Sequence, residues 1–413
     1  MKLKLTKVLL LTITTIILFG SVVADALIPY TTYTYSIDGY MQKSPDAYYP
    51  DSTITSASIQ KGLKDRVNEQ ASLKYSESWV AIQALSDVFV DELGYVYLVD
   101  TGVPSVPNSS RIIGLDEDYN LRLVINTFIN HMGVPDSLAE PSGVFVTDKE
   151  IFVADTAKAR IVVFDKVGNF VCIIPEPASD VFPEATVYKP IAVAVDSADR
   201  IYVVSATGTY GVISLNRDGS FNQFIGPQKV IPNMFELLWR NFMTEAQIKA
   251  SIKLVPTEYN NLTIDADGFL YVTTNSIKSE VQQADLIGKV KTGNNAPVKK
   301  LNPSGKDVMR RGGIFAPSGE VDVANFNSGN IKISGASAIV DVALGPNGMW
   351  SIIDKKRSRV FTYGSDGDLL FAFGDMGDQV GNIQSLVALS YQGSNLLLAD
   401  STKNSVTVFT RTS

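Results

Sequence analysis

The chain is poor in the residues that most often build metal centres and catalytic dyads. Its 413 residues include one cysteine and one histidine. A Cys/His zinc site and a disulfide framework are therefore excluded. A Ser-His-Asp or Cys-His mechanism would have to use His131. The 43 acidic residues outnumber the 36 Lys and Arg residues, which disfavours nucleic-acid binding because phosphate contacts need clustered cations.

Long hydrophobic runs are absent after the N-terminus, so no second membrane span is expected. At the N-terminus, three lysines precede the apolar run Val8–Gly20, and Ala24–Ala26 resembles a cleavage site with small residues. This layout predicts a signal peptide over residues 1–26. An uncleaved anchor is the alternative, because apolar character continues to Ile28. Both interpretations predict an extracytoplasmic protein, either secreted or anchored by its N-terminal signal.

Six copies of a two-strand pattern recur along the chain. The copy Val88–Asp91 and Val96–Thr101 is matched by Val144–Val146 and Ile151–Thr156, with a short turn between the two runs. Third strands are predicted at Arg111–Leu115, Ile161–Phe164, Gly211–Leu215, Val298–Leu301, Val360–Tyr363 and Ser405–Phe409. A fourth run follows in several copies, such as Phe221–Phe224 and Leu369–Phe373. Four antiparallel strands repeated six times predict an all-β, six-bladed propeller over residues 85–413.

The sixth copy has no fourth strand of its own, because the sequence ends shortly after Phe409. Residues 27–84 form an N-terminal arm with β-rich runs at Tyr30–Tyr35 and Ser52–Thr55. We expect one of these runs to complete the last blade and to close the ring. The alternative is an open sixth blade with an exposed edge that would favour aggregation.

Two insertions interrupt the repeat. Residues 228–254 carry apolar side chains at helical spacing, which predicts a short helical insertion. It either packs on the propeller or presents a docking face for a partner or a membrane. Residues 275–337 form a longer insertion, whose Gly312–Ser337 part is rich in Gly, Ser and Asn and is expected to be a loop.

Candidate ligand-binding residues follow from where the strands end. Asp100, Asp155, Asp354 and Asp400 end the second strands of their blades, and such ends share one face of a propeller. A ring of carboxylates there would suit a cation or a polar ligand. Alternatively, each aspartate bonds the backbone of its own turn. Arg160 and Arg359 follow two of these aspartates by five residues and could pair with them.

Two further positions are candidates near the same face. Glu258 and Tyr259 precede the first strand of the fourth copy and are predicted ligand contacts, with loop hydrogen bonding as the alternative. The turn Asp265–Gly268 begins like a calcium loop, but no later Glu completes the twelve-residue pattern. No metal or other cofactor is therefore assigned.

The repeat core Ile151–Thr156 with Arg160–Asp165 resembles an NHL repeat. Stretches along nearly the whole chain resemble exported NHL-repeat propellers of Gram-positive bacteria. They include Thr32–Tyr35, Ser44–Tyr48, Leu238–Arg240, Pro256–Tyr259, Lys300–Gly305, Phe371–Gly374 and Lys403–Phe409. The resemblance implies a six-bladed propeller on the outer side of a membrane. Some such relatives accompany sugar transporters.

Two classes of function remain open. The first is a non-enzymatic binding or scaffold propeller, a monomer whose partner is a protein or a carbohydrate, within an envelope or sugar-transport complex. A membrane-protein partner is included, and nucleic acid is not expected. The second is a metal-dependent hydrolase similar to gluconolactonases, which would recruit Glu258, Asp100, Asp155 and Asp354. A propeller lyase that uses histidines and a metal would have only His131.

Overall fold

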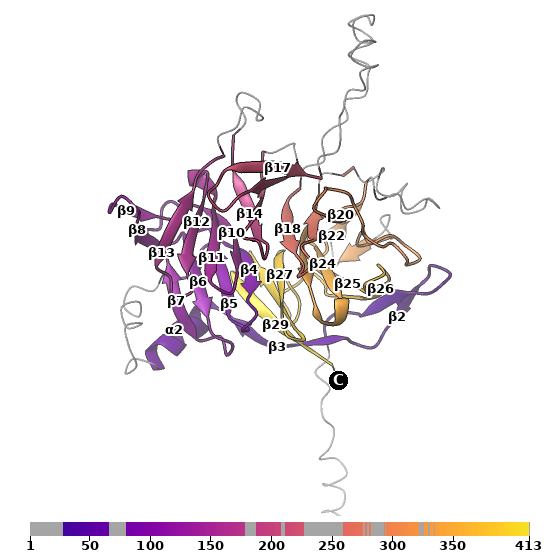
Figure 1. Cartoon of the computed structure of the whole chain (residues 1–413). Helices are drawn as coiled ribbons and strands as arrows, with labels where there is room; N and C mark the ends of the chain where they lie inside the picture. Colours follow the sequence, from indigo (N-terminus) through magenta and orange to yellow (C-terminus); the bar gives the residue numbers. More distant parts are fainter. Residues whose placement is uncertain are drawn as a thin grey trace, which may run out of the picture.

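Six antiparallel sheets surround a common centre and form a six-bladed β-propeller, as predicted (Figure 1). The computed structural model describes residues 28–65, 80–177, 187–207, 211–226, 259–275, 277–278, 281, 293, 295–321, 326–328, 331–333 and 335–412. The first strands of successive blades contact one another around the ring, so they are the innermost strands. They are β4, β10, β14, β18, β23 and β27.

Blades 1 to 3 each have four strands in sequence order. Blade 1 comprises β4 (Leu85–Val90), β5 (Val96–Asp100), β6 (Arg111–Leu115) and β7 (Leu121–Ile125). Blade 2 comprises β10 (Pro141–Val146), β11 (Glu150–Asp155), β12 (Arg160–Asp165) and β13 (Phe170–Ile174). Blade 3 comprises β14 (Pro190–Val195), β15 (Ile201–Ser205), β16 (Val212–Leu215) and β17 (Phe221–Ile225).

Blades 4 to 6 depart from this pattern. Among the described residues, blade 4 has three strands, which are β18 (Asn261–Ile264), β19 (Leu270–Thr273) and β20 (Val298–Leu301). Blade 5 has β23 (Ile339–Leu344), β24 (Trp350–Asp354), β25 (Arg359–Tyr363) and β26 (Leu369–Phe373), extended by β1 (Tyr33–Tyr35) and β2 (Met41–Lys43). Blade 6 has β27 (Leu386–Gln392), β28 (Asn395–Asp400), β29 (Ser405–Arg411) and β3 (Tyr48–Ile54).

Smaller elements lie outside the blades. They are the helix α2 (Ser56–Asp65), the hairpin of β8 (Thr127–Ile129) and β9 (Pro135–Ser137), the hairpin of β21 (Phe326–Ser328) and β22 (Ile331–Ile333), and the 3-10 turns η2 (Thr156–Lys158) and η3 (Pro346–Gly348). In the described part of the chain, no helix is long and apolar enough to cross a membrane. The predicted signal peptide and the predicted helical insertion 228–254 lie outside the described residues.

The middle strands of each blade are buried on both faces, because neighbouring blades cover them. Every residue of β5, β6, β24 and β25 is buried. This explains why these strands are nearly continuous apolar runs rather than alternating ones. The turns between strands are fixed by aspartates: Asp165 Oδ1 accepts the backbone N–H groups of Val167 and Asn169 at 3.0 and 2.8 Å. Gly168 in that turn has φ of +92°, a conformation that favours glycine.

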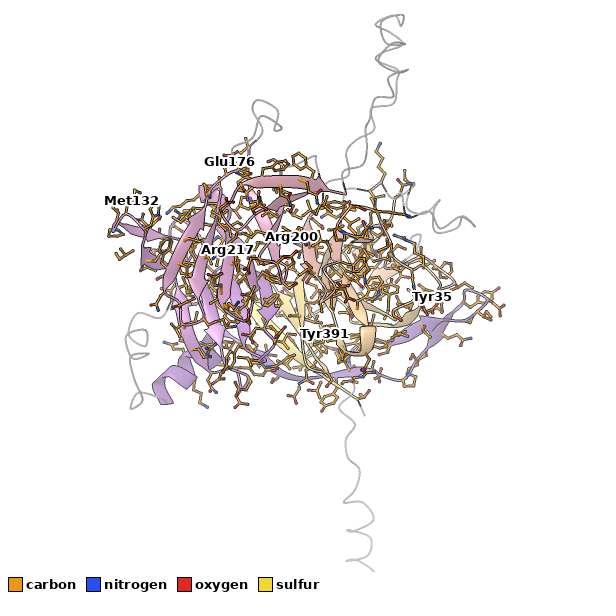
Figure 2. The ribbon with its side chains drawn as sticks, viewed as in Figure 1. Tyr35, Met132, Glu176, Arg200, Arg217 and Tyr391 are labelled. Atoms are coloured by element: carbon orange, nitrogen blue, oxygen red, sulfur yellow. The ribbon has the colours of Figure 1, made fainter. Side chains whose placement is uncertain are left out.

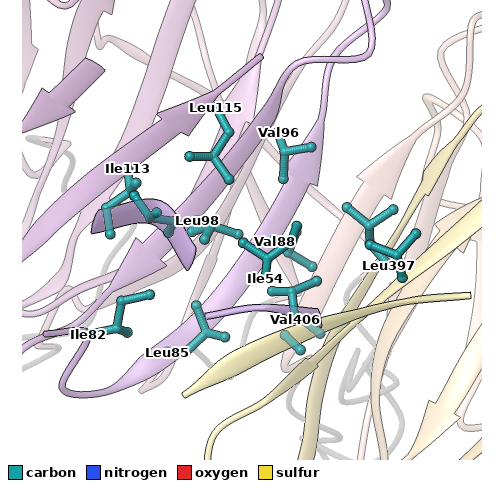
Figure 3. Close-up of a cluster of buried hydrophobic side chains, with 14 of the residues drawn as sticks. Ile54, Ile82, Leu85, Val88, Val96, Leu98, Ile113, Leu115, Leu397 and Val406 are labelled. Carbon is teal, nitrogen blue, oxygen red and sulfur yellow. The ribbon is translucent and has the colours of Figure 1, made fainter. Parts of the chain in front are cut away.

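An N-terminal strand closes the ring. Strand β3 pairs antiparallel with β29, with Ile54 opposite Val406 and Tyr48 opposite Arg411. The predicted run Ser52–Thr55 thus supplies the closing strand. Figure 3 shows Ile54 and Val406 of blade 6 packed with Leu85 and other apolar side chains of blade 1. The seam between the last and first blades is therefore a continuous hydrophobic core.

The other β-rich run of the N-terminal arm, Tyr30–Tyr35, contains β1, which joins blade 5, a position that the sequence did not indicate. Strand β1 pairs with β26 and adds an outer strand to blade 5. The hydroxyls of Tyr33 and Tyr35 donate to the two carboxylate oxygens of Glu320 at 2.8 and 2.9 Å. Arg359 donates to the same carboxylate at 2.6 Å. Burial alone would raise the pKa of Glu320, but Arg359 and the tyrosine hydroxyls outweigh it and lower that pKa.

Candidate functional site

A central channel runs between the six innermost strands. It holds a cavity of about 410 Å³ to which all six blades contribute side chains. Its wall combines apolar side chains, for example Val88, Phe145, Leu262 and Leu389, with at least as much polar surface. Tyr391, near the centre of Figure 2, lines it as well, and its hydroxyl lies 2.6 Å from that of Ser351. Concave sites that combine apolar side chains with a few placed polar groups are the usual form of ligand sites.

One position of the innermost strand differs in polarity from blade to blade. The innermost strands pair with the second strands of their blades in the same register. In each of them, one residue lies opposite the residue that directly precedes the strand-end position, for example Asp87 opposite Val99, which precedes Asp100. These residues are Asp87, Gly143, Ala192, Asn261, Asp341 and Ala388. A Cβ atom at Gly143 would lie 2.6 Å from a backbone oxygen of the next blade, so a larger residue does not fit there without a shift. At this position blades 1, 4 and 5 carry polar side chains, which are the two channel carboxylates Asp87 and Asp341 and the amide of Asn261; Asp91 and Glu92 line the cavity as well.

The two channel carboxylates bridge neighbouring blades. Asp87 accepts the N–H of Val144, on the next blade, at 3.0 Å. Asp341 accepts the N–H of Leu389, likewise on the next blade, at 2.8 Å. Asn261 donates its side-chain amide to Asp341 at 2.6 Å. Three polar side chains thus lie on one level of the cavity and are held there by the backbone edges of the inner strands.

Burial and mutual repulsion make this carboxyl pair unusually basic. Burial raises the pKa of Asp87 to about 6, although the N–H groups of Val144 and Val88 oppose the shift. Burial and then the charge of Asp87 raise the pKa of Asp341 well above its usual range. The pair therefore binds protons in a pH range where ordinary carboxylates are ionised. A ligand with a positive charge would relieve the repulsion.

The four aspartates predicted from the strand ends each make the same hydrogen bond within their own blade, and we call this bond the latch. Each lies buried at the end of its second strand and accepts a backbone N–H from the residue 16 positions earlier, at the entry to the first strand. The donors are Ala84 for Asp100, Ala139 for Asp155, Ala338 for Asp354 and Gln384 for Asp400, at 2.6–2.9 Å. Blade 3 uses a neutral equivalent, because Ser205 accepts from Lys189 at the same spacing.

Arginines complete the latch in three blades. Asp155 pairs with Arg160 at 2.7 Å, as the spacing suggested. Asp100 pairs with Arg111 at 3.2 Å. The predicted pair of Asp354 with Arg359 is wrong: Arg357 bonds Asp354 at 2.9 Å, while Arg359 is directed to Glu320. Because internal donors occupy these carboxylates, metal binding by Asp100, Asp155 and Asp354 is disfavoured, and their role as ligand contacts stays a prediction.

Two further sequence candidates, Tyr259 and His131, do not line the channel cavity. Tyr259 is buried, and its hydroxyl donates to the carbonyl of Gly226 at 3.1 Å. Burial raises its pKa far above the usual range. Glu258 lies outside the described residues. His131 is exposed in the turn between β8 and β9, next to Met132 at the left edge of Figure 2.

The calcium-loop candidate is explained by local bonds. Asp265 accepts the N–H groups of Asp267 and Phe269 at 3.1 and 2.8 Å, as the other aspartate turns do. Its second oxygen pairs with Lys300 at 2.8 Å. Across the described residues, no three His, Cys, Asp or Glu side chains are grouped closely enough to hold a metal ion.

The channel aspartates, which the sequence analysis did not single out, have a signal in the sequence. Asp87 and Asp341 interrupt apolar first strands at a position where other copies have Gly143, Ala192 or Ala388. A charged residue inside an innermost strand is rare unless a partner holds it. Comparing the six first strands position by position would have singled out both aspartates.

Comparisons with known proteins identify no family for this chain. No protein-family model matches the sequence, and no curated protein matches it. Among solved structures, a protein of unknown function from Bacteroides thetaiotaomicron is 13% identical, with a TM-score of 0.49, and the match covers 91% of this chain and 80% of that one. A streptogramin B lyase is 11% identical, with a TM-score of 0.44 and coverage of 81% and 95%. An inactive variant of virginiamycin B lyase from Staphylococcus aureus, solved with quinupristin, is 10% identical, with a TM-score of 0.45 and coverage of 80% and 95%. Nothing about the activity of this chain follows from likenesses at this level, and membership of the NHL family stays a prediction.

Proposed function

We propose that this protein is a non-enzymatic, extracytoplasmic binding propeller of the NHL type that takes a ligand in its central channel. The proposal rests on the channel itself, a cavity of about 410 Å³ whose wall combines apolar side chains with the buried carboxyl groups of Asp87 and Asp341. Export is inferred from the N-terminal sequence pattern.

The chemistry of the wall defines the kind of ligand. Asp87 and Asp341 accept N–H groups, but unlike Asp100, Asp155 and Asp354 they form no salt bridge with a described residue. Their oxygens can therefore accept a further bond from a cationic or hydrogen-bond-donating group. Val88 and Leu389 offer apolar surface to the rest of the ligand. A small amine, an amino sugar or the amino group of a peptide fits this combination, and an anionic ligand does not. An envelope or sugar-transport complex is the proposed setting.

The metal-dependent hydrolase is the less favoured alternative. Three of its four proposed ligands, Asp100, Asp155 and Asp354, are engaged by backbone N–H groups and arginines. A metal at those positions would have to break the latch that holds each blade. We therefore derive no catalytic step from them.

A ligand panel tests the proposal. The melting temperature of the purified protein is measured with small amines, amino sugars, neutral monosaccharides and calcium chloride. We expect amines or amino sugars to raise it, and the double variant Asp87→Asn/Asp341→Asn to lose that response. Asp118→Asn, at an exposed turn, is the matched control. A response to calcium alone that persists in the double variant would favour the hydrolase, and a panel without any response would contradict channel binding.

A further inference from the structure

The hairpin of β1 and β2 extends blade 5 two strands beyond the ring (Figure 1, indigo, at the right). Its tip carries large side chains that face solvent. Ile37 is 88% exposed, Tyr40 73% and Met41 54%. Single exposed apolar residues are ordinary on a surface, but three within five positions on a projecting tip form a patch that usually marks an interface. We call Ile37, Tyr40 and Met41 the knob.

A cavity of about 430 Å³ lies directly beside the knob. Ile314, Phe315 and Leu369 give it an apolar wall, and Tyr35 and Ile37 of the hairpin border it. The hairpin is fixed against this wall: the rings of Tyr35 and Phe315 are 5.0 Å apart. A Cβ atom at Gly39 would lie 3.1 Å from Phe315. We call this cavity the hole.

A knob and a hole on one surface are the two halves of a twofold interface. In such an interface the same patch serves both copies, so residue i of one copy contacts residue j of the other, and the reverse. Strand β2 adds a backbone element, because it is the outermost strand of its sheet and all three of its residues are exposed. An antiparallel pairing of two β2 strands would bring each knob towards the hole of the other copy.

We propose that this surface binds a second copy of the chain to form a twofold dimer, in place of the monomer expected from the sequence. The charges of the surface are complementary in this arrangement. Asp38 is exposed on the knob, and Arg310, whose side chain is 74% exposed, lies two residues before the wall of the hole. Arg310 pairs on its own copy with Asp366, and exposed pairs of this kind contribute little. Its guanidinium is therefore available to Asp38 of the second copy.

The size of the patch sets the expected strength. The three knob residues and the exposed part of Ile314 offer roughly 500 Å² of apolar surface per copy, taking about 150–200 Å² for each large side chain. Stable interfaces bury about 1,200–2,000 Å² in total. The dimer therefore lies at the weak end, with dissociation at micromolar concentration, and its formation depends on protein concentration.

Sedimentation velocity of the purified protein between about 1 and 200 µM tests the proposal. We expect a shift from monomer to dimer across this range. Ile37→Asp should raise the dissociation constant at least tenfold, because it places a charge in the apolar hole. Since Ile37 is exposed, this variant should keep the fold, which its melting temperature verifies. Leu93→Asp, on another exposed turn, is the matched control and should dimerise normally.

Charge reversal identifies the surface independently. Asp38→Arg and Arg310→Asp should each weaken the dimer, and the chain that carries both should regain it. A protein that is monomeric at 200 µM overturns the proposal. Dimers that Ile37→Asp and Leu93→Asp affect equally would also overturn it, because self-association would then use another surface. None of these outcomes depends on a ligand in the channel.

Discussion

Tyr48 provides a direct test of how the ring is closed. Its side chain is fully buried, and its ring lies 5.3 Å from that of Phe373 and 5.9 Å from that of Phe371. Its neighbour Tyr49, on the opposite face of β3, is 40% exposed. If β3 closes blade 6 in this register, the two adjacent tyrosines must differ strongly in their contribution to stability.

The magnitude follows from the packing. Replacing a fully buried aromatic residue by alanine costs about 3–5 kcal/mol, since the cavity is only partly refilled. Tyr48→Ala should therefore lower the free energy of unfolding by about that amount. Tyr48→Phe removes the hydroxyl, which donates to the carbonyl of Ser394 at 3.2 Å and also interacts with the Tyr391 hydroxyl, and should cost about 1 kcal/mol. Tyr49→Ala should change it by less than about 1 kcal/mol.

Urea unfolding followed by circular dichroism measures the three variants against the unchanged protein. Equal decreases in the free energy of unfolding for Tyr48→Ala and Tyr49→Ala would refute the register of β3. A larger decrease for Tyr49→Ala would indicate a register shifted by one residue. Deleting residues 27–60 should abolish cooperative unfolding altogether. An unchanged melting temperature after that deletion would show that the ring does not depend on the N-terminal arm.

Three further predictions concern buried charges. Folding raises the pKa of Asp87 from 3.8 to about 6, so the protonated group stabilises the fold below pH 4. This stabilisation, at most about 3 kcal/mol, is lost as the pH rises through 6. Asp87→Asn should flatten this pH dependence in urea titrations at pH 4 and pH 7, and an unchanged slope would contradict the assignment. Asp354→Ala should cost about 3–5 kcal/mol because it removes the carboxylate partner of the fully buried Arg357, whereas Ser205→Ala at the equivalent position should cost about 1 kcal/mol; similar losses would argue against a charged latch. Glu320→Gln should remove the negative charge that Arg359 and the two tyrosine hydroxyls bond, and so speed hydrogen exchange in β1; unaltered exchange there would show that the carboxylate does not hold the hairpin.

The repeated strand pattern of the sequence was sufficient to predict the propeller architecture. The third strands Arg111–Leu115 and Val298–Leu301 and the fourth strand Leu369–Phe373 have the predicted bounds. Repeated copies make such predictions robust, because each blade buries its strands against its neighbours in the same way. The closing strand could be inferred by counting, since a ring of four-stranded blades leaves one strand to be supplied.

Long-range contacts could not be read from the sequence. Arg359 was expected to pair five residues away with Asp354, yet it bonds Glu320, which precedes it by 39 residues. The helix α2 and the position of β1 on blade 5 were likewise not indicated. The strand-end aspartates were correctly placed at one end of their strands, but spacing alone could not show whether a ligand or a backbone N–H faces their oxygens.

Calorimetric titration of the channel with the best amine of the panel tests the central claim most directly. Carried out at pH 6 in two buffers of different ionisation enthalpy, it reports both the affinity and the number of protons released. A cation that binds beside Asp87 and Asp341 should displace protons from this pair, so we expect proton release that disappears, together with most of the affinity, in Asp87→Asn/Asp341→Asn. Unchanged affinity and proton release in the double variant would contradict binding in the channel.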